Sequence, residues 1–162
     1  TWRDEGVEYE MPDLLHLAED SIDFETLIDP NDPLFAPPGG MPARITQYCH
    51  DRGLAAPTTH GEFAICILKS LAHAYKKTLA EIASVTGRTI SLVHILGGGS
   101  QNNLLNQLTA DICGITVKTG PVEATLFGNI AVQAISAGVL PNLTAARSLI
   151  EKSFTSKVFI PR

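Results

Sequence analysis

A glycine-rich turn between an apolar run and a helical pattern constrains this chain more than any other feature. Residues 90–96 are largely apolar and β-branched, which predicts a short buried strand. Gly97, Gly98 and Gly99 end that run, and a helical period opens at Asn102. Glycine is needed where the backbone turns sharply with φ above zero, or where a ligand approaches more closely than a Cβ permits. The sequence therefore predicts a strand, a glycine turn and a helix in succession.

The start of the helix after this turn is suited to an anionic ligand. Its unpaired N–H groups and partial positive charge favour a phosphate or the polar edge of a nucleotide. The glycine spacing matches neither the dinucleotide fingerprint G-x-G-x-x-G nor the phosphate loop G-x-x-x-x-G-K-[ST]. Two interpretations therefore stay open from these residues: a nucleotide-binding turn, and a tight strand-to-helix connection without a ligand.

Composition restricts the class of protein. The 162 residues are enough for one ordinary domain, and a hydrophobic content of 44% with 18% charged residues is typical of a globular chain. The net charge of −5 and the lack of a run of Lys or Arg do not indicate binding to the phosphate backbone of nucleic acid. No apolar segment has the length of a membrane span and no signal-peptide pattern is recognisable, so we expect a cytoplasmic protein without a membrane partner.

Three scattered cysteines without a C-x-x-C motif favour thiols in a reducing compartment over a zinc site or a disulfide framework. Cys49 and Cys66 fall in consecutive expected helices, and a pairing between them stays open. Because the chain begins at Thr1 with a helical pattern almost at once, we expect a piece of a longer protein.

The remaining pattern predicts a helix-rich chain with a little sheet. Residues 29–41 are rich in Pro, Gly and Asp, which favours a packed surface connection over a lid. Thr59 and Glu62 form a capping box ahead of a long helix whose residues 63–68 should be deeply buried. His73 on that helix is expected in solvent, and Gly128 within a later helix suggests close packing against another backbone or a ligand. Helices are expected at residues 11–19, 43–52, 59–85, 102–113, 123–137 and from 144, and strands at 90–96, 115–118 and 157–160.

No catalytic constellation is visible in these residues. There is no G-x-S-x-G, no H-E-x-x-H and no carboxylate pair whose placement the pattern guarantees. The chain thus offers a binding element without obvious chemistry of its own.

Three blocks of the sequence stand out together: Gly-Gly-Gly-Ser-Gln-Asn-Asn-Leu-Leu-Asn-Gln-Leu-Thr-Ala-Asp at 97–111, Gly-Pro-Val-Glu-Ala-Thr at 120–125 and Gly128-Asn129. They resemble the C-terminal half of the FGGY-type carbohydrate kinases, and in particular the branch that phosphorylates L-rhamnulose. The resemblance continues through residues 28–33, 42–45 and 62–79, and so covers nearly the whole chain.

The resemblance implies an actin-like ATPase fold of two ribonuclease H-like lobes with the nucleotide between them. Residues 1–162 would be a single-domain fragment, a partial α/β C-terminal lobe that is helix-rich with a small sheet. In such kinases the glycine turn holds the adenosine and α-phosphate region of ATP, with Mg²⁺ bound mainly through the nucleotide. Carried over to this sequence, Gly97, Gly98 and Gly99 would let the nucleotide lie against backbone, and Ser100 and Asn102 would offer it polar contacts.

The chain departs from the family in what it does not contain. The resemblance assigns the first phosphate loop, most sugar contacts and the aspartate base to an N-terminal lobe, and a second phosphate-contacting turn to residues before Thr1. It therefore implies no catalytic residue and no metal ligand here, a sugar bound through the other lobe, and a fragment that is inactive alone and self-associates. A kinase of fuculose, xylulose or glycerol stays an alternative, as does a non-catalytic actin-like interaction module.

Overall fold

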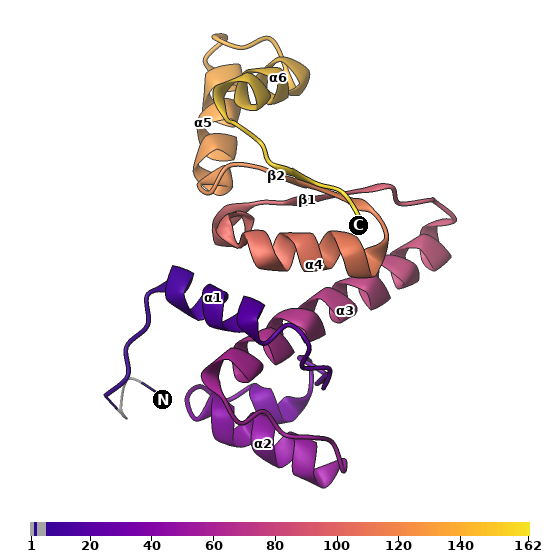
Figure 1. Ribbon diagram of the computed structural model, residues 1–162. Coiled ribbons are helices and arrows are strands. Elements are labelled where there is room, and N and C mark those ends of the chain that lie inside the picture. The colour runs from indigo at the N-terminus through magenta and orange to yellow at the C-terminus, as the bar shows by residue number, and fades with distance from the viewer. Residues whose placement is uncertain (1, 3–5) are drawn as a thin grey trace. The chain divides into compact units, whose positions relative to one another are not determined.

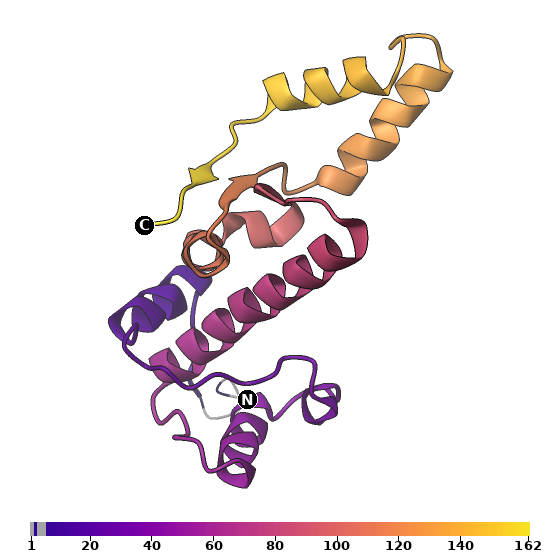
Figure 2. The ribbon, with the colours of Figure 1, turned by 90° about the vertical axis from the view of Figure 1, so that its right-hand side faces the viewer.

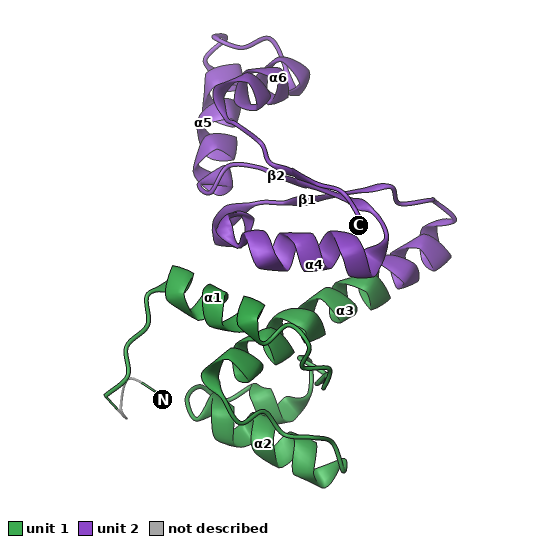
Figure 3. Cartoon of the chain, viewed as in Figure 1, with its two compact units in different colours: residues 1–78 green, residues 79–162 purple. Residues whose placement is uncertain are grey.

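The computed structural model describes residue 2 and residues 6–162, which form two compact units. The first unit spans residues 1–78 and the second residues 79–162 (Figure 3). Helix α3 (His60–Thr86) begins in the first unit and ends in the second. Each unit is described by itself below.

The first unit is helical. It contains α1 (Met11–Asp20), the short 3₁₀ helix η1 (Pro33–Phe35), α2 (Met41–Asp51) and the first part of α3 (Figure 1). Helix α2 begins two residues before the predicted start, because Pro42 is accommodated in the first turn, where its missing N–H has no helical partner. A cluster of buried side chains forms the core: Ile28, Ile45, Tyr48, Cys49, Phe63 and Cys66.

The capping box predicted for α3 is confirmed. The backbone N–H of Glu62 donates to Thr59 Oγ1 over 3.2 Å, and the Thr59 N–H donates back to Glu62 Oε2 over 3.1 Å. The pKa of the Glu62 carboxyl is lowered, mainly by the hydrogen bond from the Thr58 backbone N–H and next by the one from the Thr58 hydroxyl. Past the cap, the predicted burial of residues 63–68 is confirmed for every position except the half-buried Ile67, and His73 is exposed as predicted.

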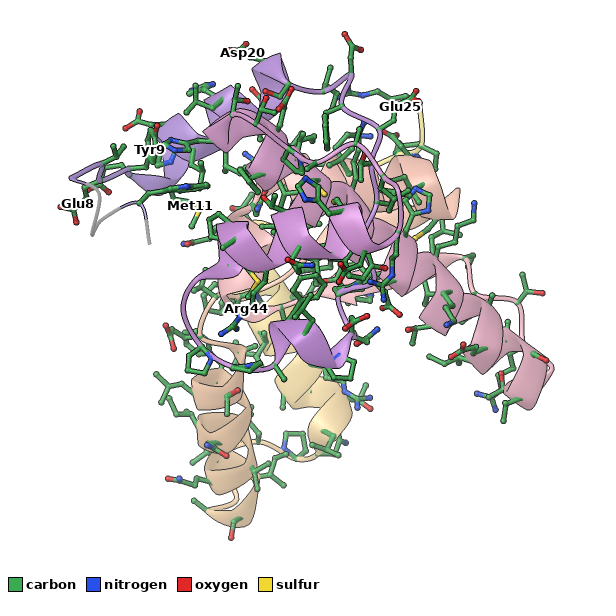
Figure 4. The ribbon with its side chains drawn as sticks, turned by 90° about the horizontal axis from the view of Figure 1, so that it is seen from below. Glu8, Tyr9, Met11, Asp20, Glu25 and Arg44 are labelled. Carbon is green, nitrogen blue, oxygen red and sulfur yellow. The ribbon has the colours of Figure 1, made fainter. Side chains whose placement is uncertain are left out.

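The proline-rich connection at residues 29–41 is irregular, as predicted, apart from η1 and its last residue, Met41, which begins α2. Asp32 Oδ1 accepts a hydrogen bond from the Leu34 N–H over 2.9 Å and so caps η1. Arg44 on α2, labelled in Figure 4, donates to the carbonyl oxygens of Pro37 and Pro38. These contacts within one unit fit a packed connection.

Cys49 and Cys66 are buried free thiols, so the disulfide alternative is not the one found. Burial raises the pKa of both thiols, that of Cys66 to about 11.

The second unit holds a small sheet with helices. Its elements after α3 are β1 (Leu92–Ile95), the 3₁₀ helix η2 (Gly97–Gln101), α4 (Asn103–Cys113), β2 (Thr116–Thr119), α5 (Ala124–Ser136), α6 (Leu143–Ser153) and β3 (Val158–Phe159). The sheet order is β1-β2-β3, with β1 parallel to β2 and β3 antiparallel to it. The chain returns from α6 to place β3 beside β2 (Figure 2). The predicted class, a helix-rich α/β chain with a small sheet, is confirmed.

Two predictions about burial in this unit are wrong. Strand β1 is not buried: its residues alternate between exposed and half-buried, because it is an edge strand of the sheet and lacks a neighbour on one side. Only the central strand carries a fully buried apolar side chain, Val117. Close packing of Gly128 against another backbone is also not found, since a Cβ at that position would meet no heavy atom within 4 Å, and packing against a ligand stays a prediction.

No helix in the described part of the chain is both long and apolar enough to span a membrane.

Candidate functional site: the glycine turn

The glycine turn lies between the end of β1 and the start of α4, as the sequence predicts. Among its three glycines, only Gly97 has a positive φ, of 75°. That conformation favours glycine strongly, so Gly97 is required by the turn itself. Gly98 and Gly99 lie in the 3₁₀ helix η2 with ordinary φ values, and their lack of a side chain needs another explanation.

The carbonyl oxygens of the turn are held by hydrogen bonds from the same chain. Ser100 Oγ donates to the Gly97 carbonyl over 2.7 Å, and the Asn102 N–H donates to the Gly99 carbonyl over 3.2 Å. The carbonyl of Ser100 accepts from Asn106 Nδ2 over 3.1 Å. The backbone of the turn is therefore fixed before any ligand binds.

Asn102 is the N-cap of helix α4. Its Oδ1 accepts from the Leu105 N–H over 2.9 Å, an N-cap that typically stabilises a helix by about 1 kcal/mol. Ser100 is buried, and its hydroxyl is engaged with Gly97. The structure thus brings Gly97, Gly98, Gly99, Ser100 and Asn102 together in one continuous turn. It gives the side-chain oxygens of Ser100 and Asn102 a role in holding that turn.

The second motif block lies directly against the first. The Gly97 N–H donates to the Pro121 carbonyl over 3.1 Å, and the Gly120 N–H donates to the Ile95 carbonyl over 3.0 Å. A Cβ on Gly120 would lie 2.3 Å from Leu96 Cδ2, so the absence of a side chain there permits the approach. Sequence reasoning did not predict this contact. The available signal was the succession of strand, helix and strand over residues 90–118, which is typical of parallel neighbours, and the carboxyl ends of such strands meet at one edge of a sheet.

The space beside Gly98 is open. A Cβ built on Gly98 would meet no heavy atom within 4 Å, and one on Gly99 would meet only the side chain of Ile95, at 3.6 Å. A flat or phosphorylated ligand can therefore approach the backbone at Gly98 without displacing any part of this chain. This opening lies at the carboxyl edge of the parallel strands.

Asn106 is a site residue that sequence reasoning missed. It lies on α4 with none of its surface exposed, and its Oδ1 is the one buried side-chain polar atom without a partner in the described part of the chain. Burying an unpaired amide oxygen costs about 1–3 kcal/mol. The available signal was a polar residue on the helical face that Leu105, Leu108 and Thr109 also bury.

A cavity of about 760 Å³ adjoins the second block on the same unit, lined by Leu96 and Gly120 among others. Lys118 and Glu151 also line it and form a 2.7 Å ion pair, which holds the pKa of the Glu151 carboxyl below its ordinary value. No cluster of three or more His, Cys, Asp or Glu suited to a metal ion occurs among the residues that the structure describes.

Comparison with known proteins identifies the family. Residues 1–137 match the profile of the FGGY family of carbohydrate kinases, C-terminal domain. The chain therefore belongs to the FGGY family of carbohydrate kinases, and the resemblance predicted from its motifs is confirmed.

The curated relatives are more specific. The chain is 42% identical over 153 residues to the rhamnulokinase of Mannheimia succiniciproducens, covering 94% of this chain and 32% of the relative. It is 41% identical over 159 residues to the rhamnulokinase of Enterococcus faecalis, covering 97% of this chain and 32% of that relative. The chain thus spans about a third of the length of these relatives. A xylulose kinase from Rhodospirillum rubrum shows a weak likeness over 52% of this chain and 17% of its own, with a TM-score of 0.43 and 21% identity.

Proposed function

We propose that this chain is the nucleotide-binding C-terminal part of a kinase that transfers the ATP γ-phosphate to the 1-hydroxyl of L-rhamnulose. Membership of the carbohydrate kinase family and the rhamnulokinases at about 40% identity support this proposal. The observation that carries the nucleotide role is the open backbone at Gly98 in a turn whose carbonyls are already engaged.

In this proposal the turn binds and orients ATP. Gly97 makes the bend, and Gly98 and Gly99 let the adenosine and α-phosphate region lie against the backbone. Asn102 donates to the nucleotide through Nδ2, because only its Oδ1 is engaged, with the Leu105 N–H. The single hydroxyl donor of Ser100 is engaged with the Gly97 carbonyl, so the Ser100 side chain can only accept a hydrogen bond from the nucleotide. Mg·ATP, when bound, supplies the transferable phosphoryl group, and the metal is held mainly through the nucleotide.

The sugar is proposed to bind through the part of the relatives' length that this chain does not span. Phosphoryl transfer needs both substrates positioned and the developing charge stabilised at once, and residues of the glycine turn alone supply neither a base nor a first phosphate loop. We also propose that residues 1–162 form a single domain, since helix α3 runs without a break through the boundary between residues 78 and 79.

The purified 162-residue chain is expected to bind Mg·ATP weakly and to catalyse no transfer. A coupled assay for ADP with L-rhamnulose should read at background, whereas a titration followed by amide chemical shifts should move the signals of residues 97–101. Sugar-dependent turnover by this chain would contradict the proposal that the sugar binds outside it. Unmoved signals at residues 97–101 in millimolar Mg·ATP would contradict the proposal that the glycine turn binds the nucleotide.

Self-association of the isolated chain is a further expectation. Helix α5 leaves Leu126 and Ile130 about half exposed, at 53% and 52%, and their spacing of four residues places them on one face. Light scattering should show the mean mass rising with protein concentration. Ile130→Gln should reduce that rise, with Gln133→Ala on the same helix as its control. A strictly monomeric chain at millimolar concentration would contradict it.

A further inference from the structure

Asn106 joins helix α4 to the glycine turn. Its Nδ2 donates to the carbonyl of Ser100, six residues earlier in the chain, while its Oδ1 is buried and unpaired. The side chain has no exposed surface, so neither group is turned to solvent. No part of the proposed function uses this residue directly.

The orientation of the amide follows from its partner. The Ser100 carbonyl only accepts hydrogen bonds, so Asn106 must present its NH₂ group there, and Oδ1 is then directed away. A leucine is also branched at Cγ and would bury no unpaired acceptor in the same place. Leucine would, however, leave the Ser100 carbonyl without this hydrogen bond, so the two effects on the free energy of unfolding oppose each other. What asparagine supplies and leucine does not is the bond that holds the Ser100 carbonyl.

The other two bonds to the turn's carbonyls come from Ser100 and Asn102, which belong to the turn or flank it. Asn106 differs because it lies a full helical turn inside α4, which packs against β2. We infer that Asn106 is a positioning residue: it fixes the glycine turn relative to helix α4 without touching a ligand. The expectation that Asn106 also affects the affinity for ATP rests on the proposed function.

The test compares Asn106→Leu with Thr109→Val in the 162-residue chain. Thr109 is a matched control, because it is also fully buried on α4 and its hydroxyl donates only to the Leu105 carbonyl of the same helix. With one hydrogen bond removed, amide hydrogen exchange at residues 98–100 should quicken by about twofold to tenfold in Asn106→Leu and stay unchanged in Thr109→Val. The melting temperature of Asn106→Leu should stay close to that of the wild type, because leucine removes the unpaired Oδ1 but leaves the Ser100 carbonyl without this partner. A lower melting temperature with unchanged exchange at residues 98–100 would overturn the inference.

Asn106→Asp tests the same hydrogen bond with a side chain of nearly the same size, in case Asn106→Leu does not fold. The introduced carboxyl group can donate to the Ser100 carbonyl only while it is protonated, and burial raises its pKa above the ordinary value of about 3.9. Exchange protection of residues 98–100, corrected for the intrinsic rate, should approach the wild-type value at low pH and fall as pH rises through that pKa. Protection equal to that of the wild type at every pH would overturn the inference.

Titration with Mg·ATP separates this inference from the proposed function. If the wild-type chain binds ATP, Asn106→Leu should weaken that binding by about the same twofold to tenfold factor as the exchange. If the wild-type chain shows no response to ATP, the proposed function fails, while the exchange result still decides whether Asn106 positions the turn.

Discussion

Replacing Gly98 by valine should raise the KM for ATP in the full-length kinase by one to three decades and leave the KM for the sugar nearly unchanged. The Gly98 φ is not positive and a Cβ there meets no heavy atom within 4 Å, so a side chain at this position meets neither backbone strain nor a clash at its Cβ. Its side chain fills the space in which the nucleotide would lie against the backbone. Losing two or three contacts of about 1–1.5 kcal/mol each gives the expected loss of affinity.

Gly97→Val is the matched control for this effect. Gly97 has a φ of 75°, which a β-branched residue resists, so its replacement should lower the melting temperature whatever the nucleotide does. Gly98→Val should instead leave the melting temperature within about 2 °C of the wild type, because no strain is introduced. A Gly98→Val kinase with an unchanged KM for ATP and a lowered melting temperature would make Gly98 a turn residue only.

Local signals predicted most of the helices. The long helix α3 was expected at residues 59–85 from its capping box and apolar spacing, and it is found at His60–Thr86. The end of α4 follows from Gly114, whose φ of 68° terminates the helix. Such signals act within a few residues, and a sequence displays them directly.

Burial was harder to predict, because it depends on neighbours far away in the chain. An apolar run such as residues 92–95 reads as a central strand, yet β1 is at the edge of the sheet. In α3, the apolar face continues to Ile82 and Val85, but these side chains are 45% and 87% exposed. Periodicity identifies which face of a helix is apolar and does not show what covers that face.

The candidate site was predictable only as a turn. Three glycines before a helical period indicate a sharp connection, and the Asn102 cap follows from the preference for asparagine at helix starts. The contact between Gly97 and Pro121 depends on strand pairing across 24 positions, and Asn106 reaches the turn only through the geometry of α4. Both need the positions of elements that the local sequence does not specify.

Gly61→Ala should be among the most destabilising single-methyl changes in this chain. Gly61 is buried at the start of α3, and a Cβ there would lie 2.3 Å from the Leu17 carbonyl oxygen and 2.4 Å from Ser21 Oγ. The Leu17 oxygen belongs to the backbone of α1, so it cannot move aside as the end of a side chain can. Overpacking of this kind costs about 1–3 kcal/mol, which corresponds to a fall in melting temperature of about 4–8 °C at the middle of that range.

Gly128→Ala is the control, because it makes the same chemical change in another helix. No heavy atom lies within 4 Å of a Cβ at Gly128, and alanine has the higher helix propensity by about 1 kcal/mol, so this variant should be more stable than the wild type. Thermal unfolding followed by circular dichroism therefore should move in opposite directions for the two substitutions. Helix propensity alone predicts a gain at both positions, so a stabilised Gly61→Ala would show that α1 does not pack against α3 at Leu17 in solution.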